Sequence, residues 1–173
     1  MKGQQSASSP KFGLWSGWQD QGSLWEGIRH CNILIENIYN VIDMTEEEMN
    51  MWAAEAKFLK AYYHFLLFTY YGPIPIVDIN LPISASDNAV RVKRETVDRC
   101  VEYIVQTIDD ALIHLPSRVL SSNDLGRIDQ VIAKSIKSRV LVYAASPLFN
   151  GNSEMYSGSV SYTHLTLPTK DQG

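Results

Sequence analysis

The sequence of 173 residues has few cysteines, no strong charge of one sign and no long apolar run. Its two cysteines, Cys31 and Cys100, are too few and too far apart for a disulfide framework, and the sequence leaves open whether they are buried thiols or one disulfide. The net charge of −4 excludes a general electrostatic attraction to nucleic acid or anionic lipid. The longest apolar candidate, 58–71, is interrupted by polar residues and falls short of the ~20 residues of a membrane helix.

Signals for export and catalysis are also missing from this sequence. The first 20 residues contain no apolar core of the kind that a signal peptide needs. We find no Gly-rich phosphate loop, no nucleophile elbow and no zinc-binding helix motif. The pair Asp109-Asp110 belongs to a helix, where adjacent side chains point about 100° apart and cannot flank one bond, so we expect a solvated face there. The sequence therefore predicts no enzyme, with no catalytic residue, no metal site and no cofactor.

Helical periodicity dominates what is present. From position 24 an apolar residue recurs every three or four positions, which predicts a helix over about 24–43. The residues of its apolar face are Ile28, Cys31, Ile35, Ile38 and Ile42.

A second helix is predicted over 46–71. Thr45 and Glu48 form the pattern of a capping box, in which each side chain satisfies a free backbone N–H of the other. The sequence Gly-Pro-Ile-Pro at 72–75 ends this helix, and 74–79 is expected to be extended. Its apolar spacing runs through Met49, Trp52, Ala56, Leu59, Tyr63, Leu66 and Tyr70. Among these aromatic residues we expect core packing, and His64 between them is expected to be a packed or rim histidine.

Two further helices are predicted over about 95–115 and 129–146, and residues 80–93 between the pairs show no clear element. Asp129 is a plausible N-cap of the last helix. The fold class is therefore all-α, built from irregular tetratricopeptide-like helical pairs. We expect a disordered polar lead over 1–11, a helical-repeat region over 12–152 and a tail over 153–173.

Trp15 and Trp18 are the candidate ligand-binding residues. They lie in a polar, Gly-rich segment before the first helix, and a Trp on a loop can stack on the apolar face of a sugar ring or on a partner surface. The alternative is that both rings close the end of the helical core, because Trp is usually well buried.

Several phrases of the sequence, in this order, resemble one family. They are WEGIRHCNILIENI at 25–38, AEAKFLKAYYHFLLFTYYGPIPIV at 54–77, RETVDRCVEYIVQTIDDALIHLP at 94–116 and GRIDQVIAKSIKSRVLVYAASPLFNGN at 126–152. Together they resemble the SusD/RagB family of nutrient-uptake outer-membrane lipoproteins. The chain departs from the family pattern at Asp129-Gln130, where a Thr-Lys-like pair is expected.

This resemblance implies a non-catalytic protein that binds oligosaccharides, or sometimes peptides, at the cell surface. The family delivers them to a TonB-dependent outer-membrane transporter of the SusC type, which would be the partner. Full-length members are several times longer and begin with a signal peptide and a lipidated cysteine. Neither is present in this sequence, so the resemblance implies an N-proximal or internal fragment whose membrane attachment would come from an anchor outside it.

The end of the chain departs from the helical pattern. After Asn152 the pattern stops, and VSYTHL at 160–165 resembles the translation of a transposon-type sequencing adapter. We therefore expect 153–173 to be a non-native or disordered tail. The alternative is a natural Thr-rich C-terminal tail.

Two rival hypotheses accompany glycan capture. The first is a cytosolic helical-repeat scaffold that binds a partner peptide, which the missing signal peptide favours. The second is a piece of an α-helical glycoside hydrolase, which would need two carboxyl groups roughly 5–10 Å apart in a cleft, and no pair of loops in the sequence supplies them.

Overall fold

The computed structural model describes residues 13–17 and 22–150, and within them every regular element is a helix. The four long helices are α1 (Leu24–Asn37), α2 (Glu46–Tyr71), α4 (Val97–Leu112) and α5 (Gln130–Ala144). Short helical turns complete the set, namely η1 (Ile38–Asn40), α3 (Asp87–Val90) and η2 (Ser122–Asp124). The all-α class and the four predicted helices are thus confirmed. The predicted lead 1–11 and tail 153–173 lie outside the described residues and stay predictions.

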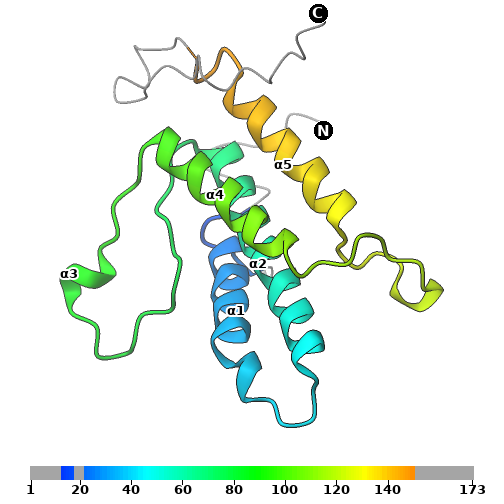
Figure 1. Cartoon of the computed structure of the whole chain (residues 1–173). Helices are drawn as coiled ribbons and strands as arrows, with labels where there is room; N and C mark the ends of the chain where they lie inside the picture. Colours follow the sequence, from blue (N-terminus) through cyan, green and yellow to red (C-terminus); the bar gives the residue numbers. More distant parts are fainter. Residues whose placement is uncertain (1–12, 18–21, 151–173) are drawn as a thin grey trace, which may run out of the picture.

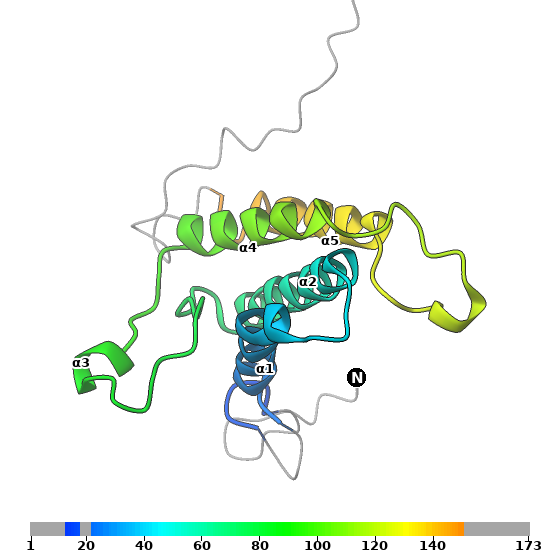
Figure 2. The same cartoon turned by 60° about the horizontal axis from the view of Figure 1, so that its bottom comes forward.

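The helices form two layers (Figures 1 and 2). α1 and α2 run antiparallel as one hairpin, and α4 and α5 lie side by side across it. α2 is the central element, since it packs against α1, α4 and α5. The connection between α2 and α4 leaves the body as a long excursion that carries α3. Two helical pairs joined by such an excursion confirm an irregular array.

The helix starts follow local capping chemistry. At α2 the Thr45 hydroxyl accepts from the Glu48 amide at 3.2 Å and the Glu48 carboxylate accepts from the Thr45 amide at 2.9 Å, which confirms the capping box. At α5 the Asp129 carboxylate accepts from the Ile132 amide at 2.9 Å, which confirms the predicted N-cap. At α4 the N-cap is Thr96, which the sequence prediction overlooked when it began the helix at 95.

The first helix is shorter than predicted. It ends at Asn37, and the chain tightens into η1 and turns into an extended conformation at Val41. Ile42, which the periodicity placed on the buried face, is 100% exposed. The stripe was wrong at this position because a period of 3.6 residues holds only while the backbone stays helical.

The apolar stripe predicted on α2 was also wrong as a description of the core. Trp52 and Tyr70 are 42% and 60% exposed, whereas the buried apolar residues lie on several sides of the helix. A helix surrounded by other helices buries more than one face, so a single stripe does not describe it. The buried apolar residues of α2 are Ala53, Ala54, Ala56, Phe58, Ala61, Phe65, Leu67 and Phe68.

The stripe predicted on α4 is confirmed, because this helix has one buried face and one solvated face. Its buried residues join the α2 residues and Ala133, Val140 and Ala144 of α5 in one core. The α4 set is Val97, Cys100, Val101, Ile104, Ile108 and Ala111. Cys31 and Cys100 are both buried free thiols, which decides between the two alternatives left by the sequence.

Candidate functional site

Trp15 lies at the end of the helical hairpin, in a turn that is bonded to the start of α1. The Leu24 amide donates to the Leu14 carbonyl at 2.9 Å, which holds the turn in place. The Trp15 ring is partly buried against the core. It meets the rings of Trp25 and Tyr71 edge to face, with centroids 5.1 Å and 5.2 Å apart. Such geometry adds about 0.5–1.5 kcal/mol per aromatic pair beyond simple burial.

Arg94 anchors the same cluster from the chain segment before α4. Its guanidinium carbon lies 5.1 Å from the centroid of the Trp15 ring, and its Nη1 donates to the carbonyls of Tyr71 and Pro73 at 3.0 Å and 2.8 Å. The cation–π contact and these bonds tie the turn, the end of α2 and the start of α4 together. Trp15 is therefore a ring held in one orientation. Its ligand-binding role stays a prediction, and Trp18 lies outside the described residues.

A buried polar network lies next to this cluster. The His64 ring lies 6.1 Å from the Trp25 ring and is fully buried in the middle of α2. Its Nδ1 donates to the Lys60 carbonyl at 2.8 Å, and its Nε2 accepts from the Val77 amide at 3.3 Å. Both bonds require the neutral ring with its proton on Nδ1. Burial accordingly lowers the pKa of His64 to about 4.

Lys60 and Tyr103 hold the other side of this network through Asp78. The buried Lys60 ammonium donates to the carboxylate and the backbone carbonyl of Asp78 at 3.0 Å each, and the Tyr103 hydroxyl donates to the carboxylate at 2.8 Å. Burial opposes ionisation of Asp78, but these bonds and the Lys60 charge hold the pKa of its carboxyl below the usual value. Burial, followed by the bond to Asp78, raises the pKa of Tyr103.

The network fastens the extended segment 74–79 onto the helices. Besides the bonds at Val77 and Asp78, the Ile74 carbonyl accepts from the Glu95 amide at 3.0 Å. Polar side chains thus take the place of a neighbouring strand for this backbone. The packed His64 expected from the sequence is confirmed. Its bond to the Val77 amide, 13 positions away, was missed, and the polar Lys60 and His64 inside an apolar run were the available signal.

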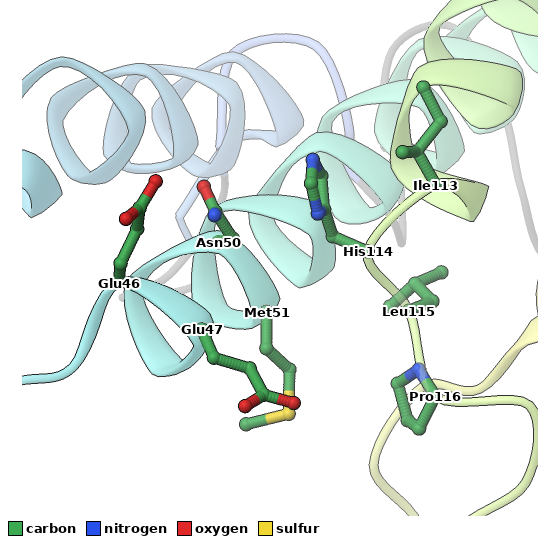
Figure 3. A pocket seen from close by; sticks show the side chains of 8 residues that line it. All are labelled: Glu46, Glu47, Asn50, Met51, Ile113, His114, Leu115 and Pro116. Carbon is green, nitrogen blue, oxygen red and sulfur yellow. The ribbon is translucent and has the colours of Figure 1, made fainter.

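A separate groove lies between the first turns of α2 and the end of α4, and we call it the α2–α4 groove (Figure 3). It has a volume of about 610 Å³. The side chains of Glu47 and Met51, one helical turn apart, extend in the same direction, and Glu46 points the other way. The groove is lined by Glu46, Glu47, Asn50, Met51, Ile113, His114, Leu115 and Pro116.

A smaller hollow of about 200 Å³ continues the groove and shares Met51 and Pro116 with it. At its rim Arg127 pairs with Glu55 at 3.0 Å and with Asp124 at 3.6 Å. The Arg127 guanidinium also lies over the ring of Trp52, 4.5 Å from its centroid. This stacking gives the exposed Trp52 a neighbour and orders the 117–129 loop against α2.

The carboxylates that a catalytic hypothesis would need are occupied elsewhere. Asp109 accepts two bonds from Lys137 of α5 at 2.6 Å and 2.8 Å, whereas Asp110 accepts from Gln106. The two side chains therefore have different partners, one on α5 and one on their own helix. Among residues 13–17 and 22–150, no three His, Cys, Asp or Glu side chains gather where they could hold a metal ion. None of the helices formed by these residues is long and apolar enough to cross a membrane.

A family comparison identifies this arrangement of helices. Residues 18–142 match the SusD-like family model described as "Starch-binding associating with outer membrane". The chain belongs to the SusD-like family. The match contains α1, α2 and α4 and all but the last two residues of α5, so the family covers both layers together with the excursion and the α4–α5 loop.

Solved SusD-like structures have the same fold over this region. The chain is similar to the protein named BT4246, with 36% identity and a TM-score of 0.68 over 75% of this chain. A SusD-like protein from Bacteroides fragilis is 26% identical over 70% of the chain, with a TM-score of 0.63. A laminarin-binding SusD-like protein is 24% identical over 76%, with a TM-score of 0.65, and shows the fold alone.

The chain spans only part of these solved proteins. It covers 22% of BT4246, 24% of the Bacteroides fragilis protein and 26% of the laminarin-binding protein. Among curated protein sequences, none matches the chain.

Proposed function

We infer that this chain is the helical part of a non-catalytic glycan-binding protein of the outer-membrane surface. The family match over residues 18–142 carries this proposal, because the family is described as starch-binding and associated with the outer membrane. Because the chain spans about a quarter of such proteins, the remaining part of the glycan site belongs to a longer parent protein.

Delivery to a transporter is the second part of the proposal. The captured oligosaccharide passes to a TonB-dependent transporter of the SusC type. A lipid anchor attaches the parent protein to the membrane. The cytosolic scaffold is the weaker proposal, since the matched family associates with the outer membrane. The matched family is described as starch-binding and not as a glycoside hydrolase.

Trp15 supports the glycan proposal because its ring is held in one orientation. Arg94 and two aromatic neighbours fix it, so that stacking a sugar on its accessible part would immobilise little further. Stacking of a sugar on an aromatic ring suits a protein that must release its ligand, because each such contact contributes only a modest binding free energy. Trp18, three residues further along, would extend this contact.

Isothermal titration of the complete gene product against starch and laminarin oligosaccharides tests the function. We expect saturable binding to one glycan class without any change in its chain length. Trp15→Ala and Trp18→Ala are expected to weaken binding about tenfold or more, in proportion to a lost stacking contact of roughly 1–2 kcal/mol. Trp25→Phe is the matched control, because Trp25 belongs to the same aromatic cluster and is not a predicted ligand contact.

The outcomes separate the function from the residue assignment. Glycan binding that is unchanged in both Trp variants would remove Trp15 and Trp18 from the site and leave the function standing. Absence of binding to any glycan would contradict the function itself. Shortening of the oligosaccharide during titration would show an enzyme instead.

A further inference from the structure

The guanidinium of Arg94 is held by the fold on one edge and has no protein partner on the other. Its Nη1 donates to the carbonyls of Tyr71 and Pro73, which accounts for both N–H groups of that nitrogen. Within residues 13–17 and 22–150, no carboxylate pairs with Arg94 and no acceptor bonds to its Nε or Nη2. Arg94 is exposed, so an immobilised and uncompensated cation is presented to solvent.

Positive charge is concentrated around Arg94, although the chain as a whole has a net charge of −4. The sequence Arg-Val-Lys-Arg at 91–94 places three cations in four positions, and no other four-residue stretch of the chain does so. Arg91 and Lys93 are exposed and take part in none of the ion pairs that the described residues form. The electrostatic field at this end of the excursion therefore favours an anion.

The same guanidinium lies against an aromatic ring. Its carbon is 5.1 Å from the centroid of the Trp15 ring, and Trp15 is itself only partly buried. A ligand that pairs with the free edge of Arg94 therefore has an aromatic surface within reach. An arginine and an aromatic ring next to each other suit a molecule that carries an anion directly on an apolar ring face.

A uronic acid has this combination of groups. Its carboxylate is bonded directly to the pyranose ring, so the anion and the apolar face of the sugar arrive together. The planar carboxylate matches two neighbouring N–H donors of a guanidinium, one oxygen to each, whereas a sugar hydroxyl satisfies only one of them. Because Nη1 is already occupied, the neighbouring donors that remain on Arg94 are those of Nε and Nη2.

We propose that the free edge of Arg94, next to Trp15, binds the carboxylate of a uronic acid, so that the parent protein selects acidic oligosaccharides over neutral ones. Nε and Nη2 donate to the two carboxylate oxygens, and the sugar ring lies beside the indole. This proposal rests on the glycan-binding function proposed above and names the class of sugar that the site prefers.

Isothermal titration of the complete gene product tests the proposal by comparing each acidic oligosaccharide with its own methyl ester. The acidic probes are tetrasaccharides of pectin, alginate and hyaluronan, and esterification removes their charge without changing the order of their sugars. We expect an acidic probe to bind about tenfold more tightly than its ester, the difference typical of one charge-assisted pair. Added salt should weaken binding of the acid and leave binding of the ester unchanged.

Variants of Arg94 locate the contact. Arg94→Gln is expected to bind the acid and its ester with equal affinity, and Arg94→Lys, which keeps the charge without the paired donors, should retain only part of the preference. Arg118→Gln is the matched control and should retain all of it, because it removes an exposed guanidinium beyond the other end of α4. Near-ultraviolet circular dichroism of each variant, together with its affinity for the ester, reports whether the aromatic cluster is intact.

The outcomes separate the class of sugar from the function. Equal affinity of the unaltered protein for acid and ester would overturn the proposal, and so would a preference for the acid that persists in Arg94→Gln. Binding of starch or laminarin oligosaccharides without binding of any acidic probe would also overturn it, but would leave the glycan-binding function standing. Absence of binding to every probe, neutral or acidic, would contradict that function and this proposal with it.

Discussion

At the residue scale, the buried polar groups of α2 have the most specific environment in the molecule. His64 faces Lys60 on its own helix, Asp78 on the extended segment and Tyr103 on α4. A neutral imidazole is the one form that can both donate to the Lys60 carbonyl and accept from the Val77 amide. Protonation would remove that acceptor and place a second charge beside the Lys60 ammonium.

This environment predicts a stability that depends on pH. The pKa of His64 is about 4 in the folded chain and about 6.5 in the unfolded chain, so the unfolded state takes up a proton first as the pH falls. The contribution of His64 is therefore fully present above pH 6.5 and declines as the pH falls toward 4. Urea unfolding should give a free energy about 2 kcal/mol lower at pH 5 than at pH 7 from this group.

The variant His64→Leu separates this effect from that of other groups. Asp78 and Asp129 have lowered pKa values, so their protonation in acid also destabilises the folded protein. Both carboxylates remain in the variant. We expect the variant to be less stable at pH 7, because the Val77 amide loses its acceptor, and to depend less on pH between 7 and 5. An equal pH dependence in both proteins would contradict the assignment to His64.

At the element scale, the helices begin where a side chain satisfies the free amides of the first turn. Each of the four long helices follows this rule, with caps at Ser23, Thr45, Thr96 and Asp129. Ser86 before α3 occupies the same position without a capping bond from its side chain, and α3 is only four residues long. The long helices thus begin at a side-chain cap, whereas the single turn α3 in the excursion has none.

Thr45→Ala is expected to lower the free energy of unfolding by about 1 kcal/mol, because it removes the two bonds of the Thr45 hydroxyl, one to the Glu48 amide and one to the Glu48 carboxylate. Ser86→Ala is the matched control. It should change the free energy of unfolding by less than ~0.5 kcal/mol, as exposed substitutions usually do. Thermal unfolding followed by circular dichroism measures both. Equal effects of the two substitutions would show that the capping box contributes nothing.

At the scale of the whole molecule, α2 joins the two layers into one core. The same core cluster contains residues from α1, α2, α4 and α5. The outer face of α5 leaves Val131 and Val142 exposed between polar residues, and no other described helix covers it. In a solenoid, each helical pair buries only the face next to it.

Ile104→Ala tests the joining of the layers. Ile104 is 0% exposed and lies in the core that α4 shares with α2. Its truncation leaves a cavity between the layers, and we expect a loss of about 3 kcal/mol in the free energy of unfolding, measured with urea. Ile113→Ala, at an exposed position just beyond α4, is the matched control and should change it by less than ~0.5 kcal/mol. Similar effects at both positions would contradict the two-layer core.

The sequence by itself determined the fold class, the approximate extents of the four long helices and two of their caps. These features depend on residues three or four positions apart, as in Thr45 with Glu48 or the stripe of α4. Motifs quoted from the sequence also pointed to the SusD-like family, which the family match confirms. Local patterning suffices wherever an element buries a single face.

Only the tertiary structure decided what depends on distant neighbours. α2 buries several faces because three helices pack against it. A single stripe could not describe that burial, and Trp52 and Tyr70 of the predicted stripe are exposed. The His64 and Lys60 bonds to segment 74–79 and the contact of Arg94 with Trp15 join residues far apart in the chain. The α2–α4 groove likewise forms where two separate segments meet. No local spacing encodes such contacts, because they arise from how packed helices place side chains around one another.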